Sequence, residues 1–221
     1  MNVISLLDSS CIASAIVEDM KDAVADYCRS FYSETFEEVL TAPEKHRVIE
    51  RIRRGHPVTS DEIRDVVVAF LNSWRCRISK KRSEDLRRAL QTAQAHLDNL
   101  PPELEQLQPE HLKTIAEFFD SLCAIDNVKG TAAAKTLALL RPELFVMWDA
   151  KIAENYGCAG NGIGYCRFLL TMRDIARQAR NYYGDKQHSL EEYICPTARN
   201  WIPPLAKLMD EWNWVRRDSF G

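Results

Sequence analysis

The chain has 221 residues, of which 46% are hydrophobic and 28% charged, so it is long and apolar enough to fold around a core, and wholesale disorder is excluded. Its formal net charge of −3 does not by itself suggest a nucleic-acid partner. No apolar run reaches the roughly 18 residues of a membrane helix, and the first residues do not resemble a secretory signal, so we expect a cytoplasmic protein without a membrane segment.

Apolar residues recur at helical spacing along the whole chain. The spacing predicts helices at residues 16–31, 63–74, 86–97, 112–122, 132–140, 168–179 and 205–212. Prolines and the glycine-rich residues 157–164 separate these stretches, and Ser60 and Ser83 are expected helix starts. No stretch alternates apolar and polar residues for long enough to indicate a strand. The sequence therefore predicts an all-α fold.

Basic residues are concentrated in two stretches. Residues 75–88 contain seven basic residues against two acidic ones, and residues 45–54 contain five against one. Segregated charge of this kind is typical of a protein that places one face on a polyanion, but solvated helix faces give the same pattern. The charge pattern alone leaves both interpretations open.

Histidine and cysteine residues show no spacing typical of metal ligands. The five histidines include no His-x-x-x-His pair, and the seven cysteines include no Cys-x-x-Cys pair. An odd number of scattered cysteines indicates a reducing compartment rather than a disulfide framework. We therefore expect no metal site and no bound cofactor of the usual kinds.

The segment around Gly130 is more informative. Gly130 lies between the amphipathic residues 111–125 and the small-residue stretch 132–140, which predicts two helices joined by a short turn. The N–H groups that open the second helix, together with the helix dipole, can hold a phosphate without a basic side chain. An apolar run then ends at Asp149, an expected N-cap for a helix over residues 150–156.

Together these features resemble the helix-hairpin-helix superfamily of DNA glycosylases, which includes endonuclease III and the adenine-mismatch, 3-methyladenine and 8-oxoguanine glycosylases. In that superfamily a hairpin Leu-Pro-Gly-Val-Gly-x-x-Thr-Ala precedes Val-Asp-Thr-His-Val, whose Asp is catalytic. Gly130 corresponds to the second hairpin glycine, Ala134 to the alanine, and Asp149, nineteen residues after Gly130, to the catalytic Asp. Residues 68–74 fall where the superfamily has a helix lining the base pocket. The resemblance covers about residues 60–156.

This sequence departs from the family pattern at three positions. Val128 replaces the first hairpin glycine, and Lys151 replaces the His that follows the catalytic Asp. Ala132 stands where bifunctional members carry their nucleophilic Lys. The four-cysteine iron–sulfur loop of endonuclease III is also missing. The resemblance therefore implies a monofunctional enzyme, which leaves an abasic site without cutting the strand.

The resemblance also implies a two-lobed fold and a set of site residues. Residues 60–155 would form the lobe with the hairpin, and residues 1–59 and 156–221 the other. An ionised Asp149 would stabilise the positive charge of the sugar in the transition state and position water. The DNA backbone would contact Lys129, Gly130, Thr131, Ala132, Arg75, Arg77, Lys80 and Lys81. The base pocket would contain Asn72, Trp74, Trp148 and Tyr156, with Tyr165 and Trp201 as further aromatic candidates.

The implied function is excision of a damaged or modified base from double-stranded DNA, by a monomer and without a cofactor other than a monovalent cation at the hairpin carbonyls. The base would be an alkylated or oxidised one in repair, or a hypermodified phage base such as glucosylated hydroxymethylcytosine in antiviral defence. Two alternatives remain open: a DNA-binding module without catalysis, and a bifunctional lyase that uses Lys135 or Lys151.

Overall fold

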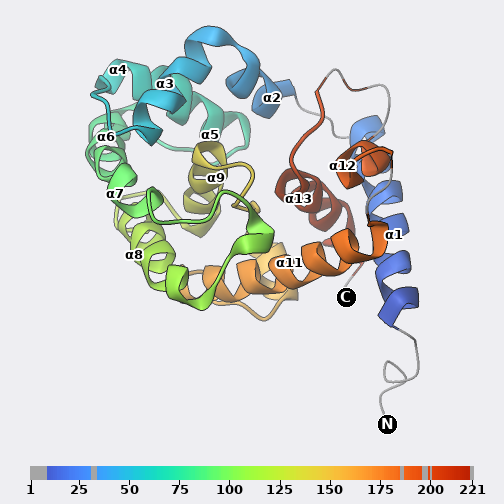
Figure 1. Cartoon of the computed structure of the whole chain (residues 1–221). Coiled ribbons are helices and arrows are strands. Elements are labelled where there is room, and N and C mark those ends of the chain that lie inside the picture. Colours follow the sequence, from blue (N-terminus) through green and yellow to red (C-terminus); the bar gives the residue numbers. More distant parts are fainter. Residues whose placement is uncertain (1–8, 31–33, 185–186, 196–198, 200, 220–221) are drawn as a thin grey trace.

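The structure is a computed structural model that describes residues 9–30, 34–184, 187–195, 199 and 201–219. In this part of the chain every regular element is a helix, which confirms the expected all-α class (Figure 1). Phe31, the last residue of the first expected stretch, lies outside the described residues. None of the helices in these ranges is long and apolar enough to span a bilayer.

Apart from α1, which has 22 residues, the helices of the first half of the chain are short, and one of them is irregular. The helices of this half are α1 (Ser9–Ser30), α2 (Glu34–Thr41), α3 (Pro43–Arg53), α4 (Ser60–Glu62), α5 (Ala69–Ser73), α6 (Ser83–Gln91) and α7 (Ala93–Leu97). A π-helical segment, Ile63–Val68, joins α4 to α5 without a break. This helix starts at Ser60, as expected, and its N-cap Thr59 forms a capping box with Glu62.

The second half contains the longer helices. They are α8 (Leu112–Cys123), α9 (Gly130–Leu140), α10 (Ala150–Asn155), α11 (Gly162–Tyr183), α12 (Leu190–Ile194) and α13 (Leu205–Arg216). In α9 every residue from Ala132 to Leu140 is buried. Its alanines leave room for neighbouring helices to approach, and α9 lies in the middle of the molecule in Figure 1.

α9 packs against α3, α5 and α8. α8 packs against both α9 and α11, and α1 packs against α11, α12 and α13. α2 packs against α5, while α3 packs against α7 and α9. Residues before position 60 therefore also pack against α9, through α3. The helices from the two chain ends, α1 and α13, lie side by side.

Candidate active site

The turn between α8 and α9 leaves the start of α9 open. Val128 is buried and its N–H donates to the Ile125 carbonyl over 2.9 Å, which anchors the turn. Lys129 is the N-cap but makes no side-chain capping bond, and the first backbone bond of the helix runs from Ala133 N–H to the Lys129 carbonyl. The N–H groups of Gly130, Thr131 and Ala132 therefore have no acceptor among the described residues and are free for an anion.

Two other segments approach Gly130 closely. A Cβ at this position would lie 3.2 Å from the Gly160 carbonyl oxygen, which is tighter than an ordinary contact. The Trp148 indole N–H donates to the Gly130 carbonyl over 3.3 Å. These contacts hold the hairpin turn against the residues that lead into Asp149 and against the turn before α11.

Asp149 occupies the N-cap of α10, as expected from the sequence. One carboxylate oxygen accepts the Ile152 N–H at 2.9 Å, and the other lies 3.2 Å from an Arg217 guanidinium nitrogen. The carboxyl is about a quarter exposed, with 28% of the side chain accessible. The cap fixes the direction of the side chain, and the ion pair with Arg217 involves the oxygen that the cap leaves free.

Asp149 lines a cavity of about 560 Å³, within the usual size range of small-ligand sites. The cavity is formed by residues from both ends of the chain and from its middle. They are Tyr27, Ser73, Trp74, Arg75, Thr131, Lys135, Asp149, Trp214 and Arg217. Three aromatic side chains and a carboxylate thus face one space.

A second hollow of about 370 Å³ continues from this cavity across the start of α9. The two share Trp74, Arg75 and Thr131 as lining residues. The remaining lining residues of the second hollow are Cys76, Arg77, Asn127, Lys129 and Ala132. The open N–H groups of α9 therefore lie where the two hollows meet, beside exposed basic side chains.

Lys135 is the buried cation of the cavity. It is 6% exposed, and its Nζ lies 4.0 Å from the centre of the Trp74 ring. Its Nζ makes no ion pair or hydrogen bond with another described residue. Burial lowers the pKa of Lys135 below its usual value, and the nearby carboxylates of Asp210 and Asp149 partly oppose this effect.

A buried ionic cluster lies behind Lys135. Lys207 Nζ is 2.7 Å from Asp210 and 3.1 Å from Glu211, and Arg199 binds Glu211 through two contacts of 2.9 Å. Asp210, the carboxylate with the largest effect on Lys135, is therefore already paired with Lys207. The cluster satisfies its own charges and leaves Lys135 without a carboxylate of its own.

The loop that carries Trp74 and Arg75 is strained. Arg75 and Arg77 have positive φ angles of 60° and 56°, a left-handed conformation that costs a non-glycine residue about 1–2 kcal/mol. Asn72 stabilises the loop because its side chain accepts the Ile78 N–H at 2.6 Å and donates to the Ile78 carbonyl at 2.8 Å. The amide of Asn72 is thus occupied within the loop, although the sequence analysis placed it in the base pocket.

Two further expected pocket residues do not line the cavity. Trp148 is 2% exposed and packs in the core against Phe119 and Tyr165. Tyr156 packs edge-on against Phe168, and its hydroxyl hydrogen bonds with Asn213 over 2.6 Å. Of the four expected pocket residues, Trp74 alone is among the side chains that line the cavity.

The two basic stretches differ in how far their charges are paired. Arg75, Arg77, Lys80 and Lys81 are exposed and form no ion pair with another described residue. In residues 45–54, by contrast, Lys45, Arg51, Arg53 and Arg54 all bind glutamates. Arg47 is the one basic residue of the second stretch without an ion pair to another described residue, so most of the unpaired cations belong to the first stretch. There Arg75 borders both hollows and Arg77 borders the second.

Three cavity residues were not expected from the sequence: Tyr27, Trp214 and Arg217. Tyr27 belongs to an apolar stripe that predicts only core packing, and Trp214 and Arg217 stand near the C-terminus without a motif. The packing of α1 against α13 brings them to the cavity, and no short-range pattern in the sequence indicates that contact.

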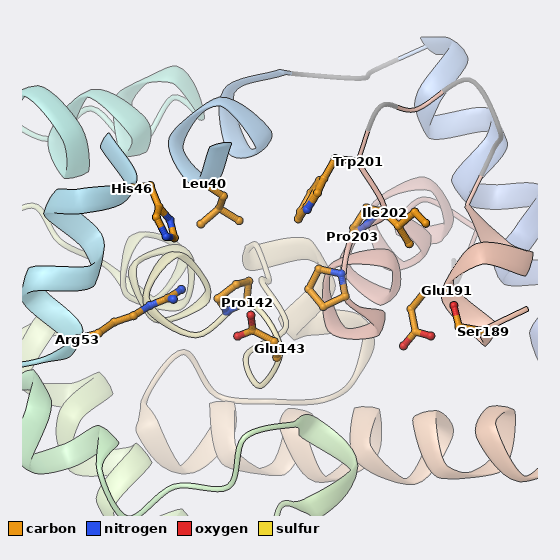
Figure 2. Close-up of a pocket in the computed structure, with 11 residues that line it drawn as sticks. Leu40, His46, Arg53, Pro142, Glu143, Ser189, Glu191, Trp201, Ile202 and Pro203 are labelled. Atoms are coloured by element: carbon orange, nitrogen blue, oxygen red, sulfur yellow. The ribbon is translucent and has the colours of Figure 1, made fainter. Parts of the chain in front are cut away.

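A separate cavity of about 470 Å³ lies at the other ends of α9 and α13, where Pro142 and Glu143 follow α9 and Pro203 and Pro204 precede α13. Figure 2 shows Trp201 and Leu40 facing each other across it, with His46 and Arg53 on one side. His46 Nδ1 and Arg53 Nε are buried there without a hydrogen-bond partner. This cavity contains neither Asp149 nor any residue of the hairpin turn, so it is not the candidate active site.

The described residues contain no cluster of three or more His, Cys, Asp or Glu side chains that would hold a metal ion. At the hairpin, the carbonyls of Ile125, Lys129 and Gly130 each accept a hydrogen bond already. Comparison of the chain with protein-family models, curated protein sequences and solved structures gave no significant match.

Proposed function

We propose that the chain is a DNA N-glycosylase that excises a modified or damaged base and leaves an abasic site. The observation that carries the proposal is the position of the Asp149 carboxylate on a cavity wall beside the open N-terminus of α9. A module that only bound DNA would have no need of a carboxylate facing the bound strand. The wider arrangement proposed with it is the two-lobed helix-hairpin-helix glycosylase fold, with residues 60–155 as the hairpin lobe and the two ends of the chain as the other.

In the proposed complex, double-stranded DNA lies across the two hollows. The N–H groups of Gly130, Thr131 and Ala132 hold one backbone phosphate, and Arg75, Arg77, Lys80 and Lys81 supply attraction that does not depend on sequence. One nucleotide leaves the duplex and its base enters the cavity, where Trp74, Tyr27 and Trp214 offer stacking surfaces.

Asp149 performs the proposed chemistry. Its ionised carboxylate stabilises the positive charge that develops on the sugar as the N-glycosidic bond breaks, and it positions the water that adds to C1′. The Asp149 carboxylate oxygen that does not cap α10 is paired with Arg217. The Arg217 guanidinium also lies 3.9 Å from the centre of the Trp214 ring. In the proposed complex it turns from Asp149 toward a DNA phosphate.

The test is Asp149→Asn, with released bases identified by mass spectrometry. Asn is as good an N-cap as Asp, so this variant removes the charge and keeps the capping bond to Ile152. Base release should be lost and DNA binding retained. Asp218→Asn is the matched control, because Asp218 also lies near Arg217, at 3.7 Å, but is not a cavity residue. Equal release by wild type and Asp149→Asn would contradict the proposal.

A second candidate function is a bifunctional glycosylase and lyase that uses Lys135. One observation favours Lys135 over Lys151: Lys135 lines the cavity with Asp149, whereas Lys151 is exposed and pairs with Glu154 at 3.4 Å. In this reaction the amine of Lys135 adds to C1′ of the opened abasic sugar and water leaves, so that an imine forms. Borohydride would reduce that imine to a stable adduct. The monofunctional proposal predicts no adduct and no strand break before alkali or heat.

A further inference from the structure

Lys135 lies deeper in the cavity than the groups that would bind DNA phosphate. Thr131 and Lys135 are four residues apart on the same face of α9, and both line the cavity. Four residues of helix correspond to about 6 Å of rise from the open N-terminus toward the interior. In the proposed complex, a nucleotide whose phosphate binds at the N-terminus of α9 would direct its sugar and base into the cavity that Asp149 and Lys135 line.

The N–H groups of the Lys135 amine are available as hydrogen-bond donors. Asp210, the first carboxylate in its surroundings, is bound by Lys207, and Asp149 is bound by Arg217 and by the Ile152 N–H. The Trp74 ring covers one side of the amine and accepts no ordinary hydrogen bond. Because Lys135 lines the cavity and has no protein acceptor, its N–H groups can bind an acceptor atom on a ligand there.

We propose that Lys135 donates a hydrogen bond to the extruded base, and that the enzyme therefore acts on electrically neutral bases that present an acceptor atom rather than on cationic N-alkylated purines. This inference rests on the proposed glycosylase function and names its substrate class. Acceptor-bearing neutral bases include oxidised purines and modified cytosines. The class excludes 7-methylguanine and 3-methyladenine, whose positive charge would face the Lys135 ammonium.

The chemistry of the leaving group supports this selection. When the bond between C1′ and the base nitrogen breaks, its electron pair goes to the base, so a neutral base leaves with negative charge on its ring and acceptor atoms. A donor aimed at those atoms stabilises the transition state. The water oxygen bonds to C1′, and the proton that the water loses ends on the departing base. A cationic base leaves as a neutral molecule and gains nothing from Lys135.

The experiment compares base release from two sets of DNA. One set carries neutral modified bases, namely 8-oxoguanine, 5-hydroxymethylcytosine and its glucosylated form, and the other carries 7-methylguanine and 3-methyladenine. Lys135→Met keeps the length of the side chain without its N–H donors, and Lys151→Met is the matched control at a lysine outside the cavity. Lys135→Gln restores a donor and provides a second variant. Unfolding curves verify that each variant folds.

Wild type should release at least one neutral base and release the cationic bases more slowly. Lys135→Met should slow neutral-base release by about 100- to 1,000-fold, as loss of a transition-state donor does in other enzymes, while Lys135→Gln recovers part of it and Lys151→Met has no effect. Binding to DNA with a stable abasic analogue should not change. Faster release of cationic bases by wild type, or an equal loss of binding to all DNA in Lys135→Met, would overturn the inference and leave the glycosylase proposal standing. Release of no base from any of these DNAs would overturn both.

Discussion

At the scale of single residues, Asp149 has a structural role and a proposed chemical role. Its cap on α10 is visible in the structure, whereas its action on a sugar is proposed, and the two can be separated by substitution. Asp149→Ala removes the capping bond to Ile152, which should lower the free energy of unfolding by about 1 kcal/mol. Asp149→Asn keeps the bond and should change that free energy by only a few tenths of a kcal/mol. Urea unfolding of both variants measures the difference, and equal losses would mean that the cap contributes little to stability.

Lys135 should make the reaction sensitive to alkaline pH. Burial lowers its pKa, so the ammonium is lost at a pH below the ordinary lysine value, while Asp210 and Asp149 oppose the shift and Lys207 adds to it. Release of a neutral base should therefore fall as the pH rises through the lowered pKa, because the neutral amine is a weaker donor. The measurement is the pH profile of release for wild type and Lys135→Arg, whose guanidinium stays charged. If base release falls in the same way at alkaline pH in both proteins, the titration of Lys135 is not the cause.

At the scale of elements, the loop between α5 and α6 and the N-terminus of α9 form the proposed DNA surface. Replacing Arg75, Arg77, Lys80 and Lys81 with glutamate should weaken binding to DNA of any sequence. It should also reduce the slope of log affinity against log salt by up to about one unit for each DNA phosphate that these side chains neutralise in the wild type. The control reverses Arg54 and Arg88, which are similarly exposed but paired with Glu50 and Glu84. If the slope does not change, these side chains are simply solvated and do not contact DNA phosphates.

How much of the fold and of the candidate site could be predicted from the sequence depends on how far apart in the chain the interacting residues lie. Helical periodicity and the cap at Asp149 are local, and both expectations are confirmed by the structure. Trp148 was expected at the pocket because it precedes Asp149, yet backbone direction turns it into the core, where it bonds to Gly130. Tyr27, Trp214 and Arg217 reach the cavity only because α1 packs against α13, and contact between the two chain ends leaves no local sequence signal. The π-helical segment before α5 likewise is not indicated by the helical spacing of its apolar residues.

At the scale of the whole molecule, the buried charges behind the cavity tie the C-terminal helix to the rest of the fold. Lys207→Met would remove the cation that binds the buried carboxylates of Asp210 and Glu211. The free energy of unfolding should fall by about 3–5 kcal/mol. Lys135→Met removes a buried charge that has no carboxylate of its own, so stability should be unchanged or higher. Thermal unfolding compares the two variants. A loss of more than about 2 kcal/mol in Lys135→Met would mean that its contact with Trp74 matters more to the fold than to a ligand.

The central claim is that the Asp149 cavity releases a modified base from DNA. The most direct measurement is mass spectrometry of bases released from alkylated, oxidised and hypermodified phage DNA by wild type and by Asp149→Asn. We expect a free modified base with wild type only, and a strand that breaks only after alkali or heat. Release of ordinary uracil or mismatched adenine as the best substrate would contradict the assignment of the pocket. No release from any DNA, or equal release by Asp149→Asn, would contradict the central claim itself.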